Sequence, residues 1–146
     1  MAVIPLDLAD VAREGGGVAW TGMPPGTTIG HVHLNVGDLD QAAAFYHDAL
    51  GLDKMVWTYP SALFLAAGGY HHHLGLNTWA GPSARPPHPD AARLLQWELR
   101  FPDAASLAAA ATSLEHAGFT VRPVDQGWLA DDPWHTTLHA LPAAAN

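Results

Sequence analysis

Apolar and polar residues alternate in two segments of the chain. In the first segment the apolar positions are Val32, Leu34 and Val36, and the polar positions are His31, His33 and Asn35. In the second segment Leu95, Trp97, Leu99 and Phe101 alternate with Gln96, Glu98 and Arg100. A period of two predicts a half-buried β-strand whose polar residues share one face.

A helix is predicted after each of these strands. Asp38 and Asp103 are N-cap residues, and Gln41 occupies the capping-box position after Asp38. Apolar residues then follow on one helical face: Leu39, Ala42, Ala43, Tyr46, Ala49 and Leu50 in the first helix, and Leu107, Ala110, Ala111 and Leu114 in the second. Gly51 and Gly118 are placed to end the two helices.

Three further strands are predicted after each helix. They span residues 54–59, 62–67 and 71–77 in the first half and residues 119–123, 127–130 and 136–141 in the second half. The order βαβββ therefore occurs twice, in modules of about residues 29–81 and 93–141, and a proline-rich loop links them. We expect an α+β fold in which residues 29–146 form a single domain and both modules build one curved mixed-sheet cup.

Residues 1–28 are predicted to form an N-terminal arm. A short helix fits residues 2–14, and the glycines at 15–17 and the Pro24-Pro25-Gly26 sequence interrupt regular structure. We expect Trp20 and Met23 to pack against the body of the protein, because they are large and apolar.

Composition narrows the function classes. Of the 146 residues, 49% are hydrophobic and 14% charged, and the formal net charge is −8, so the chain is globular and is not expected to bind nucleic acid or an anionic membrane. Cysteine is absent, which excludes disulfides, thiolate metal sites and a cysteine nucleophile. The N-terminus lacks the features of a signal peptide, and no apolar run approaches the roughly 20 residues of a membrane span. We therefore expect a cytoplasmic protein.

Alternation and the internal repeat place candidate metal ligands on the polar face. The repeat relates His31, Gly75, Gln96 and His139 to one another. Imidazole binds Fe, Mn, Ni or Zn, and a glutamine carbonyl is a weaker oxygen ligand. We predict His31, Gln96 and His139 as ligands of a divalent metal. The alternative is that the metal has been lost and that these residues line a polar pocket.

Other polar residues are candidates for catalysis and substrate binding. Of the run His71–His73, alternation points His73 into the cup and His72 toward the helix side, so His73 is the candidate acid or base. His33 and Glu98 form a second symmetric pair, with either a catalytic role or a structural ion pair. Candidate substrate-binding residues are Asn77, Trp79 and Thr137.

The duplicated βαβββ unit, together with residues 20–27, 29–34 and 62–79, resembles the vicinal oxygen chelate superfamily, and particularly the C-terminal half of catechol 2,3-dioxygenase-like proteins. The resemblance implies a metal held by a His on the first strand, a His on the fifth and a Glu on the eighth. His31 matches the first ligand, whereas Gln96 and His139 replace the other two. The set no longer matches the two-His-one-carboxylate iron site, which argues against oxygen activation and leaves metal-assisted isomerase or lyase chemistry open. Glu98 is a neighbouring source of a carboxylate.

These observations predict a small-molecule enzyme that acts on an oxygen-bearing, aromatic or polycyclic substrate. Its chemistry would be metal-assisted or would use His residues as acid and base, and the protein could form a homodimer. A metal-free binding protein, such as one that sequesters a drug, is the alternative. A third interpretation is a subunit that supplies half of a larger enzyme.

Overall fold

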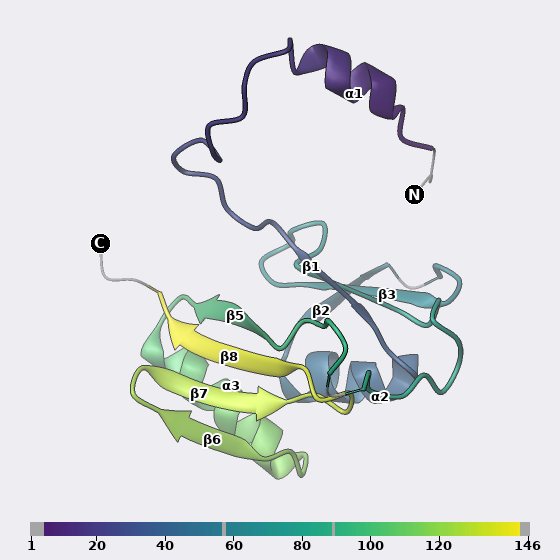
Figure 1. Cartoon of the computed structure of the whole chain (residues 1–146). Helices are drawn as coiled ribbons and strands as arrows, with labels where there is room; N and C mark the ends of the chain where they lie inside the picture. The colour runs from purple at the N-terminus through teal and green to yellow at the C-terminus, as the bar shows by residue number, and fades with distance from the viewer. Residues whose placement is uncertain (1–4, 57, 89, 144–146) are drawn as a thin grey trace.

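The computed structural model describes residues 5–56, 58–88 and 90–143 (Figure 1). Helix α1 (Leu8–Glu14) lies in the N-terminal arm. The first module contains β1 (Val32–Asn35), α2 (Leu39–Ala43), the π-helical segment η1 (Ala44–Ala49), β2 (Asp53–Val56), β3 (Ala62–Ala66) and β4 (Leu74–Asn77). The second contains β5 (Gln96–Phe101), α3 (Ala104–His116), β6 (Val121–Val124), β7 (Gly127–Asp131) and β8 (Thr137–Pro142).

The two modules share one topology. Their sheets have the orders β1-β4-β3-β2 and β5-β8-β7-β6, and in each sheet the first and last strands of the module pair in parallel. The predicted α+β fold of two βαβββ modules is confirmed. Strand pairing among the described residues stays within each module, so the structure contains two four-stranded sheets.

Both predicted N-caps are present. The Asp38 carboxylate accepts a hydrogen bond of 2.8 Å from the backbone N–H of Gln41, and the Asp103 carboxylate accepts one of 2.7 Å from Ser106. Each satisfies a backbone donor that the first turn of a helix leaves without a partner. The caps fix where each helix leaves its strand, and hence how the helix covers the sheet.

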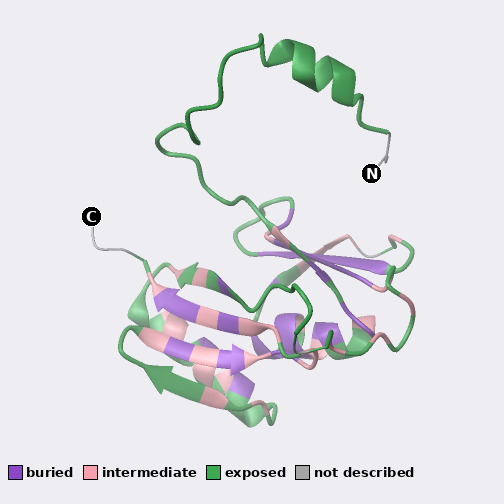
Figure 2. Cartoon of the chain, viewed as in Figure 1, coloured by how far each residue is buried: buried purple, intermediate pink, exposed green. Residues whose placement is uncertain are grey.

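The hydrophobic core includes residues from both modules. Phe45 and Tyr46 of η1 are fully buried, and their rings lie 4.9 Å from Phe119 and 6.3 Å from Trp97, measured between centroids. Figure 2 shows the alternation of buried and more exposed positions along β7 and β8. The polar faces of β1 and β5 are left outside this core.

Two sequence predictions need correction. The strand expected at residues 71–77 begins only at Leu74, because Gly68 and Gly69 adopt left-handed φ angles of 63° and 74° in the preceding turn. The strand expected at residues 54–59 spans Asp53–Val56, and residue 57 lies outside the described part of the chain.

The arm also differs from the prediction. Trp20 and Met23 do not pack against the body: they are 76% and 64% exposed. The arm leaves the body just before β1 and loops away from both sheets, with left-handed turns at Gly16 and Gly17 (Figures 1 and 2). Its helix begins at Leu8, and residues 1–4 lie outside the described part of the chain. No described helix is long and apolar enough to cross a membrane.

Candidate functional site

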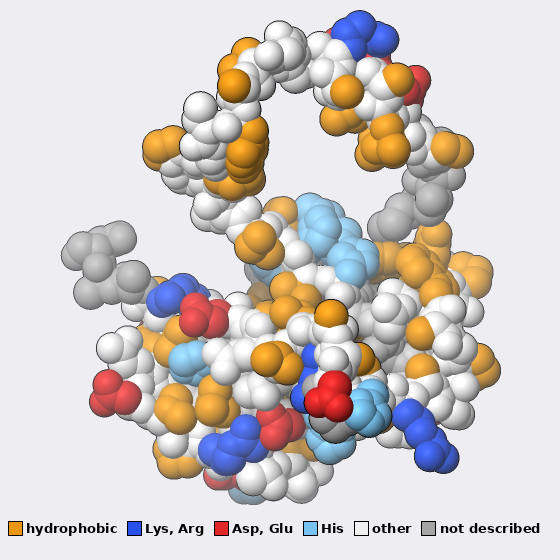
Figure 3. Space-filling view, in the orientation of Figure 1, with side chains coloured by type: hydrophobic (Ala, Val, Ile, Leu, Met, Phe, Trp, Pro, Cys, Tyr) orange, Lys and Arg blue, Asp and Glu red, His pale blue; other side chains and the backbone are white. Residues whose placement is uncertain are grey.

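Four histidines gather beside the first module's parallel strand pair. His33 is on β1, His31 directly precedes that strand, and His71 and His72 lie in the turn before β4. Val32 pairs with Leu74, and the Val32 N–H donates to the His73 carbonyl at 2.9 Å, so the start of β1 runs beside the end of the turn. Histidine side chains form a patch on the body below the arm in Figure 3. We call His31, His33, His71 and His72 the histidine cluster.

The rings of the histidine cluster are in contact. The centroid of His72 lies 4.6 Å from those of both His31 and His71, and Nε2 of His72 is 3.4 Å from Nε2 of His33. The ligand nitrogens of His31, His71 and His72 all lie within 4.8 Å of one another. Among the described His, Cys, Asp and Glu residues, this is the group of three whose ligand atoms converge.

Two histidines of the cluster, His33 and His72, have lowered pKa values. Burial lowers the pKa of His33, and the neighbouring His31 lowers it further. Burial also lowers the pKa of His72, and the nearby histidines add to that effect. A second positive charge so close to the first would be repelled, and neutral imidazole is the form that binds metals.

The predicted orientation of the His71–His73 run was wrong. His72 is 8% exposed and joins His31 and His33, whereas His73 turns the other way. The His73 ring stacks on Tyr70 at 4.6 Å, and its Nδ1 accepts a hydrogen bond of 3.2 Å from the Ala67 N–H. The strand alternation that the prediction assumed does not extend into the turn.

A second polar group lies on the other module. Glu98 and His139 are register partners on β5 and β8, with Glu98 Oε1 3.8 Å from His139 Nδ1. The Gln96 amide nitrogen is 3.3 Å from the same Nδ1, and Arg100 Nη2 is 3.3 Å from Glu98 Oε2. His139 Nε2 is buried without a hydrogen-bond partner. The sequence correctly placed these residues on one face.

A cavity of about 740 Å³ is lined by His31 of the histidine cluster and by Gln96, Glu98 and Arg100 of the second polar group, and we call it the main cavity. Its lining comes from the last residue of the arm and from both modules: Thr28, Ile29, His31, Val32, Leu94, Gln96, Trp97, Glu98 and Arg100. Predicted metal ligands His31 and Gln96 therefore share this cavity. The ligand nitrogens that lie near His31 belong to His71 and His72 of the first module, while Gln96 contacts His139 in the second module.

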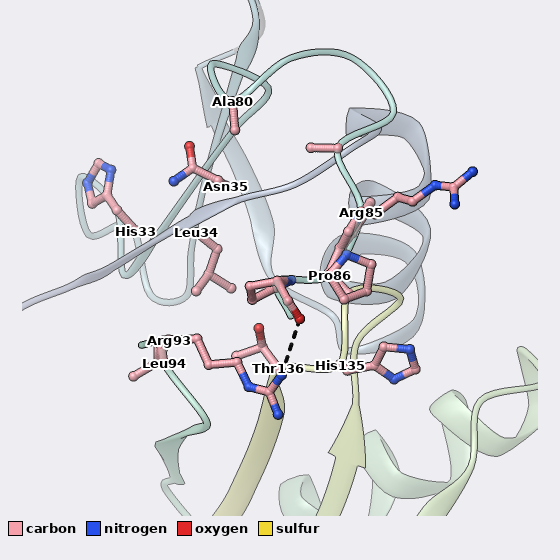
Figure 4. Close-up of a pocket in the computed structure, with 13 residues that line it drawn as sticks. His33, Leu34, Asn35, Ala80, Arg85, Pro86, Arg93, Leu94, His135 and Thr136 are labelled. Atoms are coloured by element: carbon pink, nitrogen blue, oxygen red, sulfur yellow. Dashed lines mark hydrogen bonds between the residues drawn. The ribbon is translucent and has the colours of Figure 1, made fainter. Parts of the chain in front are cut away.

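A smaller cavity of about 370 Å³ lies under the loop between the modules, and we call it the loop cavity (Figure 4). His33 and Asn35 line it from β1, and His135 and Thr136 from the turn before β8. Two arginines also line it; one of them, Arg93, donates a hydrogen bond of 3.4 Å to the Pro87 carbonyl. Sequence reasoning missed these arginines because the loop shows no periodicity.

The three predicted substrate-binding residues have local partners. Asn77 is buried, and its side-chain oxygen accepts a hydrogen bond of 3.1 Å from the Trp79 N–H. The Trp79 side chain is exposed. The Thr137 hydroxyl donates to Asp131 at 2.7 Å. None of the three belongs to the lining of the main cavity or the loop cavity.

Gly75 has a role that the sequence alone did not reveal. A Cβ at this position would lie 2.6 Å from a carbon of the His33 ring. The repeat relates Gly75 to His139. In the first module the His33 ring occupies the space that a side chain at position 75 would need. The internal repeat singled out Gly75 in the sequence. It could not show that His33 is the side chain that packs against Gly75.

Comparison with known proteins agrees with this fold. Residues 28–131 match the model of the Glyoxalase/Bleomycin resistance protein/Dioxygenase superfamily. The chain belongs to this superfamily. It is 40% identical over 135 residues to the catechol-2,3-dioxygenase of Bacillus subtilis (strain 168), a match that covers 91% of this chain and 47% of that protein. The chain thus spans about half the length of this superfamily member.

Solved structures of the superfamily show the same fold. A glyoxalase/dioxygenase from Nostoc punctiforme has a TM-score of 0.65 at 17% identity and covers 88% of this chain and 100% of its own. Lactoylglutathione lyase from Agrobacterium tumefaciens has a TM-score of 0.59 at 23% identity, with coverage of 82% and 96%. These similarities establish the architecture.

Proposed function

We propose that the protein is a small-molecule enzyme that moves a proton on an oxygen-bearing, aromatic substrate held in the main cavity. The observation that carries this proposal is the lining of that cavity. The first module contributes His31 to this lining. The second module contributes the amide of Gln96, the carboxylate of Glu98 and the guanidinium of Arg100, from alternate positions of β5.

The polar residues of β5 have complementary chemistry. Glu98 offers a carboxylate that can accept a proton, while Gln96 and Arg100 offer N–H donors to a substrate oxygen. Apolar side chains complete the lining, including Ile29, Val32 and Leu94. Such a surface suits an aromatic ring that presents oxygen atoms along one edge.

The reaction step follows from these positions. Glu98 removes a proton from a carbon next to a substrate carbonyl, the electron pair of that C–H bond forms a C=C bond, and the π pair of the carbonyl moves onto its oxygen. Gln96 and Arg100 stabilise the resulting oxyanion through their N–H groups. Arg100, whose Nη2 donates to Glu98 Oε2 at 3.3 Å, helps to hold the carboxylate in position. Glu98 then returns the proton at another atom of the substrate, which completes an isomerisation.

The superfamily relative supports the substrate class. The related Bacillus subtilis protein is named catechol-2,3-dioxygenase, so aromatic diols are the first compounds to test. The superfamily's metal positions are His31, Gln96 and His139 in this chain, and the described structure holds Gln96 against His139. The proton transfer is therefore assigned to Glu98, Gln96 and Arg100 themselves.

The test is solvent deuterium exchange and turnover with a panel of catechols, hydroxyketones and hemithioacetals, followed by NMR. We expect Glu98→Gln to lower kcat by about 10²- to 10⁴-fold, as for the loss of a general base. Glu115→Gln, on the exposed surface of α3, is the matched control and should keep full activity. Full activity in Glu98→Gln would overturn the assignment. Tight binding of the panel by wild type without exchange would instead support a binding protein.

A further inference from the structure

Three histidine side chains converge without a carboxylate among them. The ligand nitrogens of His31, His71 and His72 lie within 4.8 Å of one another. Nitrogen ligands around a tetrahedral zinc ion, each about 2.0–2.1 Å from the metal, are separated by roughly 3.4 Å. His31 and His71 are exposed, so small rotations of these two side chains would bring the set to that separation.

His72 provides an independent sign of a ligand. Its side chain is 8% exposed, its Nε2 faces Nε2 of His33 at 3.4 Å, and its Nδ1 is buried with no hydrogen-bond partner. One ring nitrogen of His72 is thus engaged by a neighbouring side chain while the other is left without a partner. This is the usual arrangement of a metal-binding histidine, whose second nitrogen is fixed by an outer neighbour.

The surroundings hold His33 and His72 in place. His33 occupies the space above Gly75, where a Cβ would clash with its ring, and Phe64 lies 5.0 Å from His72 and 6.2 Å from His33, measured between ring centroids. These contacts restrict the movement of both rings. His31 and His71 are exposed and can receive an ion from solvent.

We propose that His31, His71 and His72 bind one divalent transition-metal ion of the zinc type, with His33 positioning His72. Three neutral imidazoles suit Zn²⁺, Ni²⁺ or Cu²⁺ better than Mg²⁺ or Ca²⁺, and they leave coordination positions open. This site lies entirely in the first module and shares only His31 with the positions expected from the superfamily.

The shared residue connects this site to the main cavity. His31 is both a proposed ligand and part of the cavity wall, so an ion there would lie at the edge of the substrate site. A role of this ion as a Lewis acid toward a substrate oxygen rests on the proposed function. Metal binding itself does not, and it can be measured separately.

The test is zinc titration by calorimetry on untagged protein, purified without a nickel column and stripped with a chelator. We expect one Zn²⁺ per chain, and a loss of at least about tenfold in affinity in His31→Ala and in His71→Ala. Both side chains are exposed, so neither variant should lose its fold. Co²⁺ absorption bands should weaken in the same variants.

His73→Ala is the matched control, because His73 belongs to the same run but faces Tyr70 and Ala67. We expect its zinc affinity to equal that of wild type. Equal losses in His71→Ala and His73→Ala would mean that the histidine run binds an adventitious ion only, and absence of stoichiometric zinc in wild type would also overturn the site. Glu98→Gln should keep zinc binding even though it loses turnover, which separates the failure of this site from the failure of the proposed function.

Discussion

At the residue scale, one buried hydrogen bond joins the two modules. Tyr46 of η1 is fully buried, and its hydroxyl donates to the Asp132 carboxylate at 2.8 Å. The other oxygen of Asp132 accepts backbone N–H groups from Trp134 at 2.9 Å and Thr136 at 2.8 Å. Burial raises the pKa of Asp132 and that of Tyr46, which lies well above its ordinary value. This contact fixes the turn before β8, the strand that carries His139.

Tyr46→Phe should therefore destabilise the protein. It removes one donor from a carboxylate that is 3% exposed, which costs about 1–3 kcal/mol. The measurement is the free energy of unfolding in urea. Tyr70→Phe, a partly exposed tyrosine on the turn before β4, should leave this free energy unchanged. Equal effects of the two substitutions would mean that the Tyr46–Asp132 bond contributes nothing specific.

At the element scale, the sequence predicted regular structure well and irregular structure poorly. The strand β5 and both capped helices could be identified because alternation and capping are local signals. The orientations of His72 and His73 could not, because they depend on how a glycine turn returns the chain to β4. The repeat similarly pointed to Gln96, Glu98 and His139 as one face, whereas the arginines of the loop cavity have no local signal.

Gly127, at the start of β7, lies where the backbones of β7 and β8 approach each other closely. A Cβ there would collide with the carbonyl oxygen of Ala140 on β8, and its φ is 155°. Gly118→Ala is the control, since Gly118 has a φ of 87° but open space around it. We expect Gly127→Ala to lower the free energy of unfolding by about 1–3 kcal/mol more than the control does, because backbone on β8 has to move. Equal losses would show that backbone conformation alone limits this position.

At the scale of the whole molecule, the body has a buried hydrophobic core, whereas the arm is exposed to solvent. The body has a core built from both modules, with Phe45, Tyr46, Trp97 and Leu114 among its buried residues. Every described residue of the arm from position 5 to position 28 is exposed. Large apolar side chains on the arm are therefore nearly as accessible as in an unfolded chain, and their burial cannot contribute to the stability of the body.

Removing residues 1–27 should leave the stability of the body unchanged. The truncation keeps Thr28 and Ile29, which line the main cavity, and removes side chains whose exposure hardly changes on unfolding. We expect the same urea midpoint, and also the same slope, because that slope scales with the surface exposed on unfolding. The comparison should be made at several protein concentrations. A midpoint that falls on truncation, or that rises with concentration only in the full chain, would contradict the prediction, since either result requires the arm to bury its apolar side chains against a folded surface.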